Sequence, residues 1–459
     1  MKKGYITVFF ALIFMVLVSF VLSIFQGIKI NATKLKAECA FSVAENAVLG
    51  EYHTELLEMF DLFYVDTSFK SSFPDYHQVE AHLWEYLQEN LENAPASVEI
   101  VQITMATDNQ GTPYRKQISD YMKDKLGVAY IEQLMDLFET ASMEGCLQED
   151  FEAENLWNEK WQETVAQMEE IPDETWEKID RLSPIKEMSA VRNSFVLSQV
   201  VSTESGISKK TVDVSDLVSN RDLIVGSGTD EKVSLLDKIY FIAYVFEKFA
   251  YYSQEESEKP LDYEIEYLLG GKSSDYENLS KVAERILMIR EAMNLTYLLS
   301  DSEKMSLLKE LSSALSTLVG CPELAPVLQI LLVGIWSYAE SIMDLKLLFD
   351  DGKVPFFKSE ESWNTDLDSG LTLDILETDS KEEQEGLDYR QYLELLLLSE
   401  NDTKITYRSM DLIEMQIRQT KDNENFCIDG CAEDFTVNLI FEIPMFGSYQ
   451  MVRKFGYFS

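Results

Sequence analysis

Histidine, cysteine and basic residues are all scarce in this chain. Its 459 residues include 3 His and 5 Cys, and 39 Lys and Arg stand against 81 Asp and Glu, for a formal net charge of −42. Three histidines leave little material for His-rich metal sites or His-dependent catalysis, and five cysteines do not make a disulfide-dense scaffold. So acidic a chain is repelled by phosphate backbones. The composition therefore argues against an enzyme and against nucleic acid as a partner.

Apolar residues, in contrast, are plentiful. Hydrophobic residues make up 46% of the chain and aromatic residues 12%, which is far too much for a disordered acidic tail. A chain of this length buries sizeable cores in two or three domains. We therefore expect it to fold.

The N-terminal residues 4–28, GYITVFFALIFMVLVSFVLSIFQGI, form one run of 25 residues without a charge. As a helix, this run is longer than a hydrocarbon core of about 30 Å. A secretory signal has a shorter apolar core, of about 7–15 residues, and a small-residue cleavage site. Cys39 does not supply a lipoprotein site, because Lys36 and Glu38 precede it. We predict a single membrane anchor at 1–28 rather than a removed export signal.

The orientation of this anchor follows only weakly from charge. Lys2 and Lys3 precede the run, and three lysines follow it within eight residues, so the positive-inside count is nearly even. A short N-terminal end usually stays in the cytoplasm, which places residues 29–459 outside the cell. The acidic residues all lie in that part. They are read most simply as solvated surface, and alternatively as a surface that attracts cations or a basic wall polymer.

Helical periodicity dominates the rest of the chain. The anchor is predicted to continue as a helix through residues 31–62, and further helices are predicted at 79–91, 114–141, 156–168, 235–252, 276–299, 303–319, 327–349, 389–398 and 406–419. The apolar segment 325–338 is too short to cross a membrane and is predicted to be a buried core helix. Strands are predicted at 98–104, 263–269, 371–375, 435–443 and 449–458, with Pro444, Phe446 and Gly447 forming the turn of a closing hairpin.

These patterns predict a mainly α protein with a small β-sheet (α+β), in which the anchor runs into a long extracellular helix. Two segments rich in small and acidic residues, 202–230 and 358–384, are predicted linkers. They divide the chain into the anchor at 1–28, an N-terminal helical region at 29–201, a central helical region at 231–357 and a C-terminal α/β region at 385–459. A helical arm with three tryptophans is predicted at 157–176.

Cys427 and Cys431 are the only two cysteines close together in the sequence. Their spacing of four permits a small disulfide loop in an extracellular chain without requiring it. A zinc site needs two more ligands nearby, and none is evident. Cys39, Cys146 and Cys321 are scattered and are read as buried or free thiols. We predict no metal and no cofactor.

No pattern in the sequence predicts a catalytic site. His77 and His82 are five residues apart with Glu80 between them, which does not give the i, i+4 geometry of a helical zinc protease. His53 stands alone. GGKSS at 270–274 resembles part of a phosphate-binding loop but lacks the earlier glycine and a preceding parallel strand. We read all of these as ordinary structural residues and expect no enzymatic activity, with an extracellular hydrolase as the least favoured alternative.

Several stretches resemble one family. They are KKGYITVFFALIF, GIKINATKLKAECAFSVAENAVLGEY and ELLEMFDLFYVD near the N-terminus, and later YEIEYLLGGK, ILMIREAMNLTY, WSYAESIMDL, GKVPFFK, YRQYLELLL and RSMDLIE. Together they resemble the DUF5702 family of single-anchor proteins of Firmicutes. The resemblance implies an association with the TadE/TadG-like minor pilins of tight-adherence (Tad, Flp-type) pilus systems, and it implies no activity.

The first residues are also similar to a pilin leader, in which a short basic segment ending in Gly precedes an apolar helix. The resemblance implies processing by a prepilin peptidase between Gly4 and Tyr5. Phe9 stands where many pilins carry a Glu that pairs with a neighbour's amino terminus. A chain of 459 residues is also bulky for a subunit that repeats along a thin fibre. The resemblance therefore implies a minor, tip, initiating or platform-associated role.

We accordingly expect a non-enzymatic single-pass membrane protein. The favoured role is a pseudopilin-like or assembly component of a Tad-type surface system, with the lipid bilayer and other pilin-like proteins as partners. The alternative is a surface-anchored binding or adhesion module that is not connected with pili.

Overall fold

The computed structural model describes residues 3–71, 73–91, 97–143, 196–201, 206–228, 232–254, 258–367, 385–443 and 447–457. The chain divides into two compact units. Unit 1 consists of Met1–Tyr121, Leu217–Val233 and Met410–Ser459, and unit 2 consists of Met122–Asp216 and Ser234–Ser409. Each unit therefore contains segments that are distant in sequence, and neither coincides with one of the regions predicted above.

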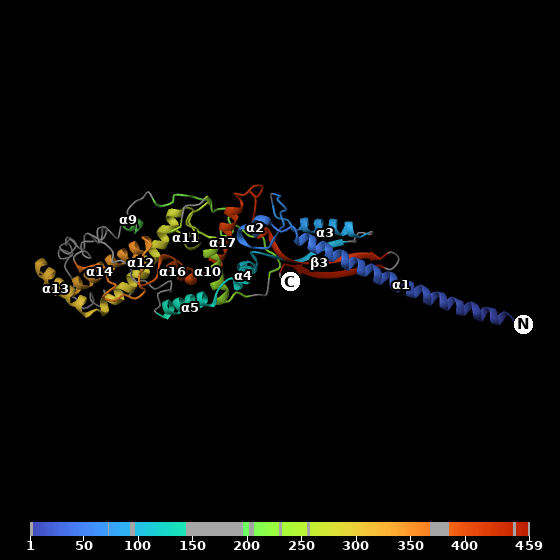
Figure 1. Cartoon of the computed structure of the whole chain (residues 1–459), viewed down its shortest axis with the longest axis horizontal. Helices are drawn as coiled ribbons and strands as arrows, with labels where there is room; N and C mark the ends of the chain where they lie inside the picture. The colour runs from blue at the N-terminus through green and yellow to red at the C-terminus, as the bar shows by residue number, and fades with distance from the viewer. Residues whose placement is uncertain are drawn as a thin grey trace. The chain divides into compact units, whose positions relative to one another are not determined.

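Unit 1 is built on one long helix and an antiparallel sheet (Figure 1). Its elements are α1 (Lys3–Leu49), α2 (Thr54–Phe60), β1 (Val65–Asp66), α3 (Tyr76–Asn90), β2 (Ser97–Met105), the start of α4 (Asp108–Lys123), the end of α17 (Asp402–Ile417), β3 (Cys431–Ile443) and β4 (Gly447–Gly456). The strands predicted at 98–104, 435–443 and 449–458 are confirmed as β2, β3 and β4.

The long strand β3 lies at the centre of the sheet. It pairs with β2 along one edge and with β4 and the short β1 along the other, and every pairing is antiparallel. β3 and β4 form the predicted hairpin, in which Ile443 pairs with Gly447. Gly447 has a φ of +92°, which favours glycine over any other residue at the start of β4. Pro444 and Phe446, also predicted in this turn, lie outside the described residues.

The second half of α1 packs on one face of this sheet. Alternate residues of β3 are buried, from Phe435 to Ile443, as expected for a strand with one covered face. α1 contributes Ala37, Ala40, Phe41, Ala44 and Val48 to the same core. The Phe41 ring meets the ring of Phe455 edge to face, with 5.7 Å between their centroids. The small side chains of Ala37, Ala40 and Ala44 let the helix approach the sheet closely.

Unit 2 is helical. It contains α5 (Val128–Met143), α9 (Val196–Val200), α10 (Leu235–Lys248), α11 (Glu264–Gly270), α12 (Asp275–Ser300), α13 (Ser302–Val319), α14 (Ala325–Phe349), α16 (Tyr389–Ser399) and the first half of α17. Local signals set the ends of these helices. Ser234 and Asp388 form capping boxes at the starts of α10 and α16, while Gly320 ends α13 with a left-handed residue. The mainly α fold with a small sheet is thus confirmed.

Helix α14 is the core of unit 2. α12 and α13 pack against it, and its residues 335–345 are all buried. The prediction that this apolar segment is a core helix is therefore confirmed. A helix that is buried on every side has no solvated face for charged residues, yet this stretch contains Glu340 and Asp344.

Two predicted helices are broken in the structure. The helix predicted to run through residue 62 ends at Leu49, because Gly50 turns the chain, Tyr52 pairs with Val65, and His53 caps a new helix, α2. The helix predicted at 114–141 is divided into α4 and α5 by a turn in which the Lys125 N–H donates to the Met122 carbonyl. Helix α10 also ends earlier than predicted, at Lys248.

The strand predicted at 263–269 is wrong, because these residues form helix α11. Their alternating polar and apolar pattern is typical of a strand with one exposed and one buried face. In the structure all seven residues of α11 are buried, and its two glutamates bind groups inside unit 2. Glu264 accepts from the Ala250 N–H and from Lys259, while Glu266 accepts from the Tyr252 N–H.

Parts of both predicted linkers are packed. Leu217 and Val218 from segment 202–230 are buried in unit 1, and Lys358 and Thr365 from segment 358–384 are buried in unit 2. The helix predicted at 156–168, the strand predicted at 371–375 and the arm predicted at 157–176 lie outside the described residues.

Candidate functional site

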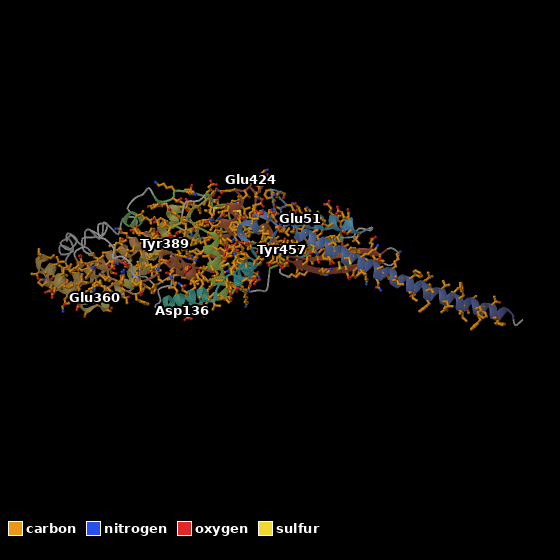
Figure 2. All side chains as sticks on the ribbon, in the orientation of Figure 1. Glu51, Asp136, Glu360, Tyr389, Glu424 and Tyr457 are labelled. Carbon is orange, nitrogen blue, oxygen red and sulfur yellow. The ribbon has the colours of Figure 1, made fainter. Side chains whose placement is uncertain are left out.

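The first half of α1 is an uncovered apolar surface (Figure 2). Every residue from Tyr5 to Ile28 is exposed, and the helix that contains them is long and apolar enough to span a membrane. The second helix that passes this test, Pro322–Phe349, has 72% of its most apolar window buried, so it is the core helix of unit 2. An exposed apolar surface as long as the first half of α1 suits a bilayer rather than water.

The predicted processing site lies at the tip of α1. Gly4 and Tyr5 are in the first turn of the helix, and the Tyr5 side chain is 77% exposed. The N–H groups of a first helical turn have no hydrogen-bond partner within the helix. The peptide bond between Gly4 and Tyr5 is therefore held less firmly than the peptide bonds that follow it.

Contacts with β4 and with Tyr457, the residue after it, hold the second half of α1 over its length. The Lys34 ammonium lies 4.6 Å from the centroid of the Tyr449 ring, and Arg453 donates to the Ser42 hydroxyl at 3.2 Å. At the end of the helix, the Tyr457 hydroxyl donates to the Leu49 carbonyl at 2.7 Å. Between Ile28 and Lys34 a helix rises by only about 9 Å. The apolar half of α1 and the sheet are therefore joined by rigid helix, with no flexible linker.

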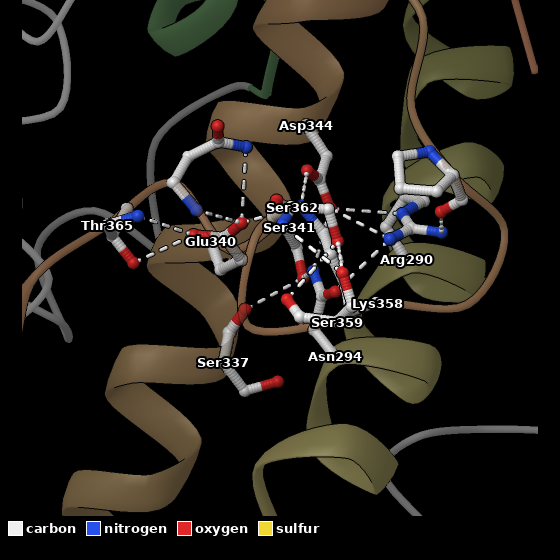
Figure 3. Close-up of polar contacts among 12 residues, drawn as sticks. Arg290, Asn294, Ser337, Glu340, Ser341, Asp344, Lys358, Ser359, Ser362 and Thr365 are labelled. Carbon is white, nitrogen blue, oxygen red and sulfur yellow. Dashed lines mark hydrogen bonds and ion pairs between the residues drawn. The ribbon is translucent and has the colours of Figure 1, made fainter. Parts of the chain in front are cut away.

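A buried ionic network lies inside unit 2 (Figure 3). The Lys358 ammonium contacts the carboxylates of Glu340 and Asp344, each at 2.6 Å. Asp344 also accepts from the Nε of Arg290 at 3.0 Å and from Asn294 at 2.9 Å. All four charged side chains are 0% exposed. Two cations and two anions balance, as buried charges require.

The remaining polar atoms of this network are also bound. Both oxygens of Glu340 accept from backbone N–H groups, those of Asn364 and Thr365. Arg290 donates to the carbonyls of Pro355 and Phe356. The network thereby connects α12, α14 and the segment around 355–365. Because no charged atom reaches solvent, its chemistry is structural: it fixes the packing of three segments and offers no group to a substrate.

A further buried carboxylate, that of Glu266, lies in an aromatic cluster of unit 2. Glu266 accepts from the Tyr389 hydroxyl at 2.7 Å and from the Tyr252 N–H at 3.0 Å, and its other oxygen has no hydrogen-bond partner among the residues that the structure describes. Burial raises the pKa of Glu266 from its ordinary 4.5 to about 7. Burial also raises the pKa of Tyr389 well above 10.0. This carboxyl group is thus poised to lose its proton near neutral pH.

A third charged cluster lies in unit 1. Arg221 donates to Glu414 at 2.8 Å and also contacts Asp429, and Arg418 lies 3.1 Å from Glu414. Glu414, Cys427 and Asp429 present ligand atoms within 4.8 Å of one another. The two arginines already supply the positive charge at this point, so we assign no metal ion to it.

The disulfide that the spacing of Cys427 and Cys431 permits is not formed in the structure, where both are free thiols. The two residues flank a single 3₁₀ turn, Ile428–Gly430, and the Cys431 Sγ points to the carbonyl of Cys427 at 3.9 Å. Burial raises the pKa of both thiols. Since the thiolate is the form that reacts and binds metals, this environment favours inert thiols.

The three histidines have separate structural partners. The Nδ1 of His53 accepts the Leu56 N–H and caps α2, and burial lowers the pKa of His53. His77 contacts Glu80 at 2.9 Å, and His82 contacts Glu51 at 2.8 Å. His77 and His82 thus use different carboxylates and share no ligand position, which agrees with the reading from spacing.

The GGKSS segment is a closed structural loop. The Lys272 N–H donates to the side chain of Asn278, and the amide of Asn278 donates back to the Lys272 carbonyl. Gly271 has a φ of +64°, and a Cβ there would collide with the guanidinium of Arg408. Arg408 in turn donates to the Leu268 and Leu269 carbonyls at the end of α11. The glycines therefore serve helix capping, and the loop does not present its Lys272 amide to a phosphate.

The ionic residues of unit 2 were not predicted as a group. They lie nevertheless in the stretches that carried the family resemblance: Arg290 in ILMIREAMNLTY, Glu340 and Asp344 in WSYAESIMDL, and Lys358 in GKVPFFK. Glu266 of unit 2 lies in YEIEYLLGGK, and Glu414 of unit 1 lies in RSMDLIE. For Arg290, Glu340 and Asp344, the signal available in the sequence was a charged residue within a largely apolar helical stretch.

Comparison with known proteins gives one family. The DUF5702 family, described as a family of unknown function, matches residues 174–443. No curated protein and no solved structure matches the chain. The matched span covers more than half of the chain, contains all four residues of the ionic network in unit 2, and begins after α1. It carries no information about pilus systems. The chain belongs to the DUF5702 family.

Proposed function

We propose that this chain is a single-pass membrane protein whose N-terminal anchor, residues 4–28, holds a non-enzymatic scaffold outside the cell. Three features support an anchor of this kind. The apolar half of α1 is uncovered, it is long enough for a bilayer, and it is followed directly by Lys29, Lys34 and Lys36, which suit the headgroup region.

The continuity of α1 carries the proposal further. A binding module that only needs attachment is served by a flexible linker. Here one helix is both the apolar segment and part of the core of unit 1, through Phe41, Ala44 and Val48. Such a helix fixes the position and tilt of the sheet relative to the bilayer. Fixed geometry is what an assembly needs when the helices of neighbouring subunits pack side by side.

We therefore propose a pseudopilin-like or assembly role at the cell surface, with other pilin-like proteins as partners and with processing between Gly4 and Tyr5. The paired and buried charges of both units support a scaffold rather than a catalyst, because they stabilise packing and do not face an open cleft.

A flexible insertion in α1 tests this role. We expect a Gly-Ser segment inserted after Asn31 to leave membrane insertion intact. The inserted chain should fail to restore surface fibres in a deletion strain, because the sheet is no longer held at a fixed position relative to the anchor. Fibres are counted by electron microscopy of the deletion strain carrying the wild-type or inserted chain, and N-terminal sequencing reports whether the mature chain begins at Tyr5.

The matched control is the same insertion after Gly127, between α4 and α5, where the chain already turns. This control is expected to restore fibres. Restoration by both insertions would contradict the fixed-geometry role, and fibres that persist in the deletion strain would favour a surface-anchored binding module without a connection to pili.

A further inference from the structure

A polar hollow of about 600 Å³ lies on the sheet of unit 1. Its walls include Gln102 and Thr104 of β2, Asn109, Ser227, Asp434 of β3 and Lys454 of β4. These strand residues alternate with the core residues Ile103, Phe435 and Phe455. The hollow is therefore on the face of the sheet opposite to α1. Its volume is in the range of about 300–1,000 Å³ that is usual for ligand sites.

One wall of the hollow is held in an unfavourable conformation. Asn109, Gln110 and Gly111 have φ values of +48°, +64° and +81°, so three consecutive residues are left-handed. Only glycine adopts this region without a cost, and Gln is poorly suited to it. Backbone strain of this kind is concentrated at binding and catalytic sites, where the surrounding structure enforces it.

Asp108, which precedes this turn, holds together the segments around the hollow. Its carboxylate accepts the N–H groups of Met105 at 2.9 Å, Gly226 at 2.8 Å and Gly228 at 3.1 Å. It is 3% exposed. These bonds connect the end of β2 to the 226–228 segment. Gly228 has a φ of +77°, and a Cβ there would lie 3.1 Å from the side-chain oxygen of Asn109. The walls are thus fixed before any ligand arrives.

The lining identifies the chemistry of the ligand. It presents two amides, two hydroxyls and one ion pair, in which Lys454 lies 3.2 Å from Asp434. The charges of Lys454 and Asp434 cancel, although the chain as a whole carries a net charge of −42. The lining therefore favours neither an anion nor a cation as its ligand. The described lining contains no aromatic side chain, so recognition relies on hydrogen bonds to a neutral, strongly polar molecule.

A peptide strand is disfavoured at this position. The Ser227 N–H donates to the Ile103 carbonyl at 2.7 Å, and the Ile103 N–H donates to the Ser227 hydroxyl at 3.1 Å. This part of the β2 edge is therefore already occupied, which prevents strand addition there. A saccharide, in contrast, presents hydroxyl and acetamido groups in many directions and matches a lining of amides and hydroxyls.

We propose that this hollow of unit 1 binds a neutral saccharide that carries hydroxyl and acetamido groups. The inference goes beyond the proposed assembly role and does not depend on pili, because binding is a property of the purified chain.

Glycan binding by the full-length chain in nanodiscs tests the proposal. An array of neutral and charged saccharides is screened first, and affinity for the N-acetylglucosamine trimer is then measured by calorimetry. Gln102→Ala removes one exposed amide. Asn109→Gly removes a second amide while keeping a residue that adopts positive φ without strain. We expect each substitution to weaken binding by about tenfold, the effect of losing one or two hydrogen bonds.

The control is Gln450→Ala, which removes an exposed amide from the same face of the sheet outside the hollow, and which should leave the affinity unchanged. Thermal unfolding of each variant shows that the fold is kept, and Asn109→Gly is expected to be at least as stable as the wild type. The proposal is overturned if no neutral saccharide binds, if Gln102→Ala and Asn109→Gly bind as tightly as the wild type, or if only charged saccharides bind.

Discussion

Replacement of Lys358 by Met is expected to destabilise the protein by about 3–5 kcal/mol, the usual cost of removing one partner from a buried ion pair. The substitution keeps an apolar side chain of similar length but leaves Glu340 and Asp344 opposite only Arg290. Urea unfolding of the full chain in nanodiscs measures the change. Tryptophan fluorescence reports on this region, because the Nε1 of Trp336 donates to Thr365, which itself binds Glu340.

The matched control for this prediction is Lys353→Met, which removes an exposed lysine from the same GKVPFFK stretch and should change the stability by less than about 0.5 kcal/mol. Adding Glu340→Gln to Lys358→Met rebalances the buried charge. The double variant should therefore be more stable than the sum of the single effects by at least about 1 kcal/mol. Strict additivity, or equal effects of Lys353→Met and Lys358→Met, would contradict the buried network.

The second large effect is a loss of stability between pH 4.5 and 8 that depends on Glu266. Burial raises the pKa of this group to about 7 in the folded state, whereas it titrates near 4.5 when unfolded. Below pH 4.5 both states are protonated, and this contribution to stability is fully present. As the pH rises from 4.5 towards 7, Glu266 loses its proton in the unfolded state but keeps it in the folded state. The free energy of unfolding therefore falls, by about 3 kcal/mol in total.

Glu266→Gln removes this dependence, because glutamine stays neutral and keeps an acceptor for Tyr389 and the Tyr252 N–H. We expect the variant to match the wild type at pH 4.5 and to be up to about 3 kcal/mol more stable at pH 8. Unfolding midpoints at several pH values measure the difference. Glu277→Gln, at an exposed position of α12, is the control. An unchanged pH profile in Glu266→Gln would refute the assignment.

Periodicity was sufficient to predict most helices of unit 2. The segments predicted at 276–299, 303–319, 327–349 and 389–398 are found as α12, α13, α14 and α16, and each helix begins and ends within two residues of its predicted bounds. Each has a local capping residue or a run of apolar residues long enough to be unambiguous. The three long strands of unit 1 were predicted for the same reason, since alternation along β3 reports one covered face.

The errors arise where tertiary contacts decide the local structure. In α11 the glutamates that suggested an exposed strand face are bound by backbone N–H groups and by Tyr389, and nothing in the local sequence indicates these partners. The end of α1 at Leu49 depends on the pairing of Tyr52 with Val65 and on the cap made by His53. A single glycine, Gly50, was too weak a signal to predict that end.

The candidate sites were harder to predict than the fold. Arg290 and Lys358 are 68 residues apart in the numbering and meet only because α12 and the 355–365 segment pack around α14. Glu340 and Asp344, one turn apart in an apolar helix, were the local indication that cations must lie nearby. The polar hollow gave no sequence signal, because its walls come from three distant segments of unit 1.

Protease treatment of intact cells tests the central claim, that α1 anchors the chain in the membrane and holds residues 29–459 outside. Cells that produce the full chain with a C-terminal epitope are treated with protease, and a cytoplasmic protein is followed as the control for cell integrity. We expect the epitope to disappear from intact cells while a membrane-bound fragment containing α1 remains. An epitope that survives until the cells are lysed would contradict it.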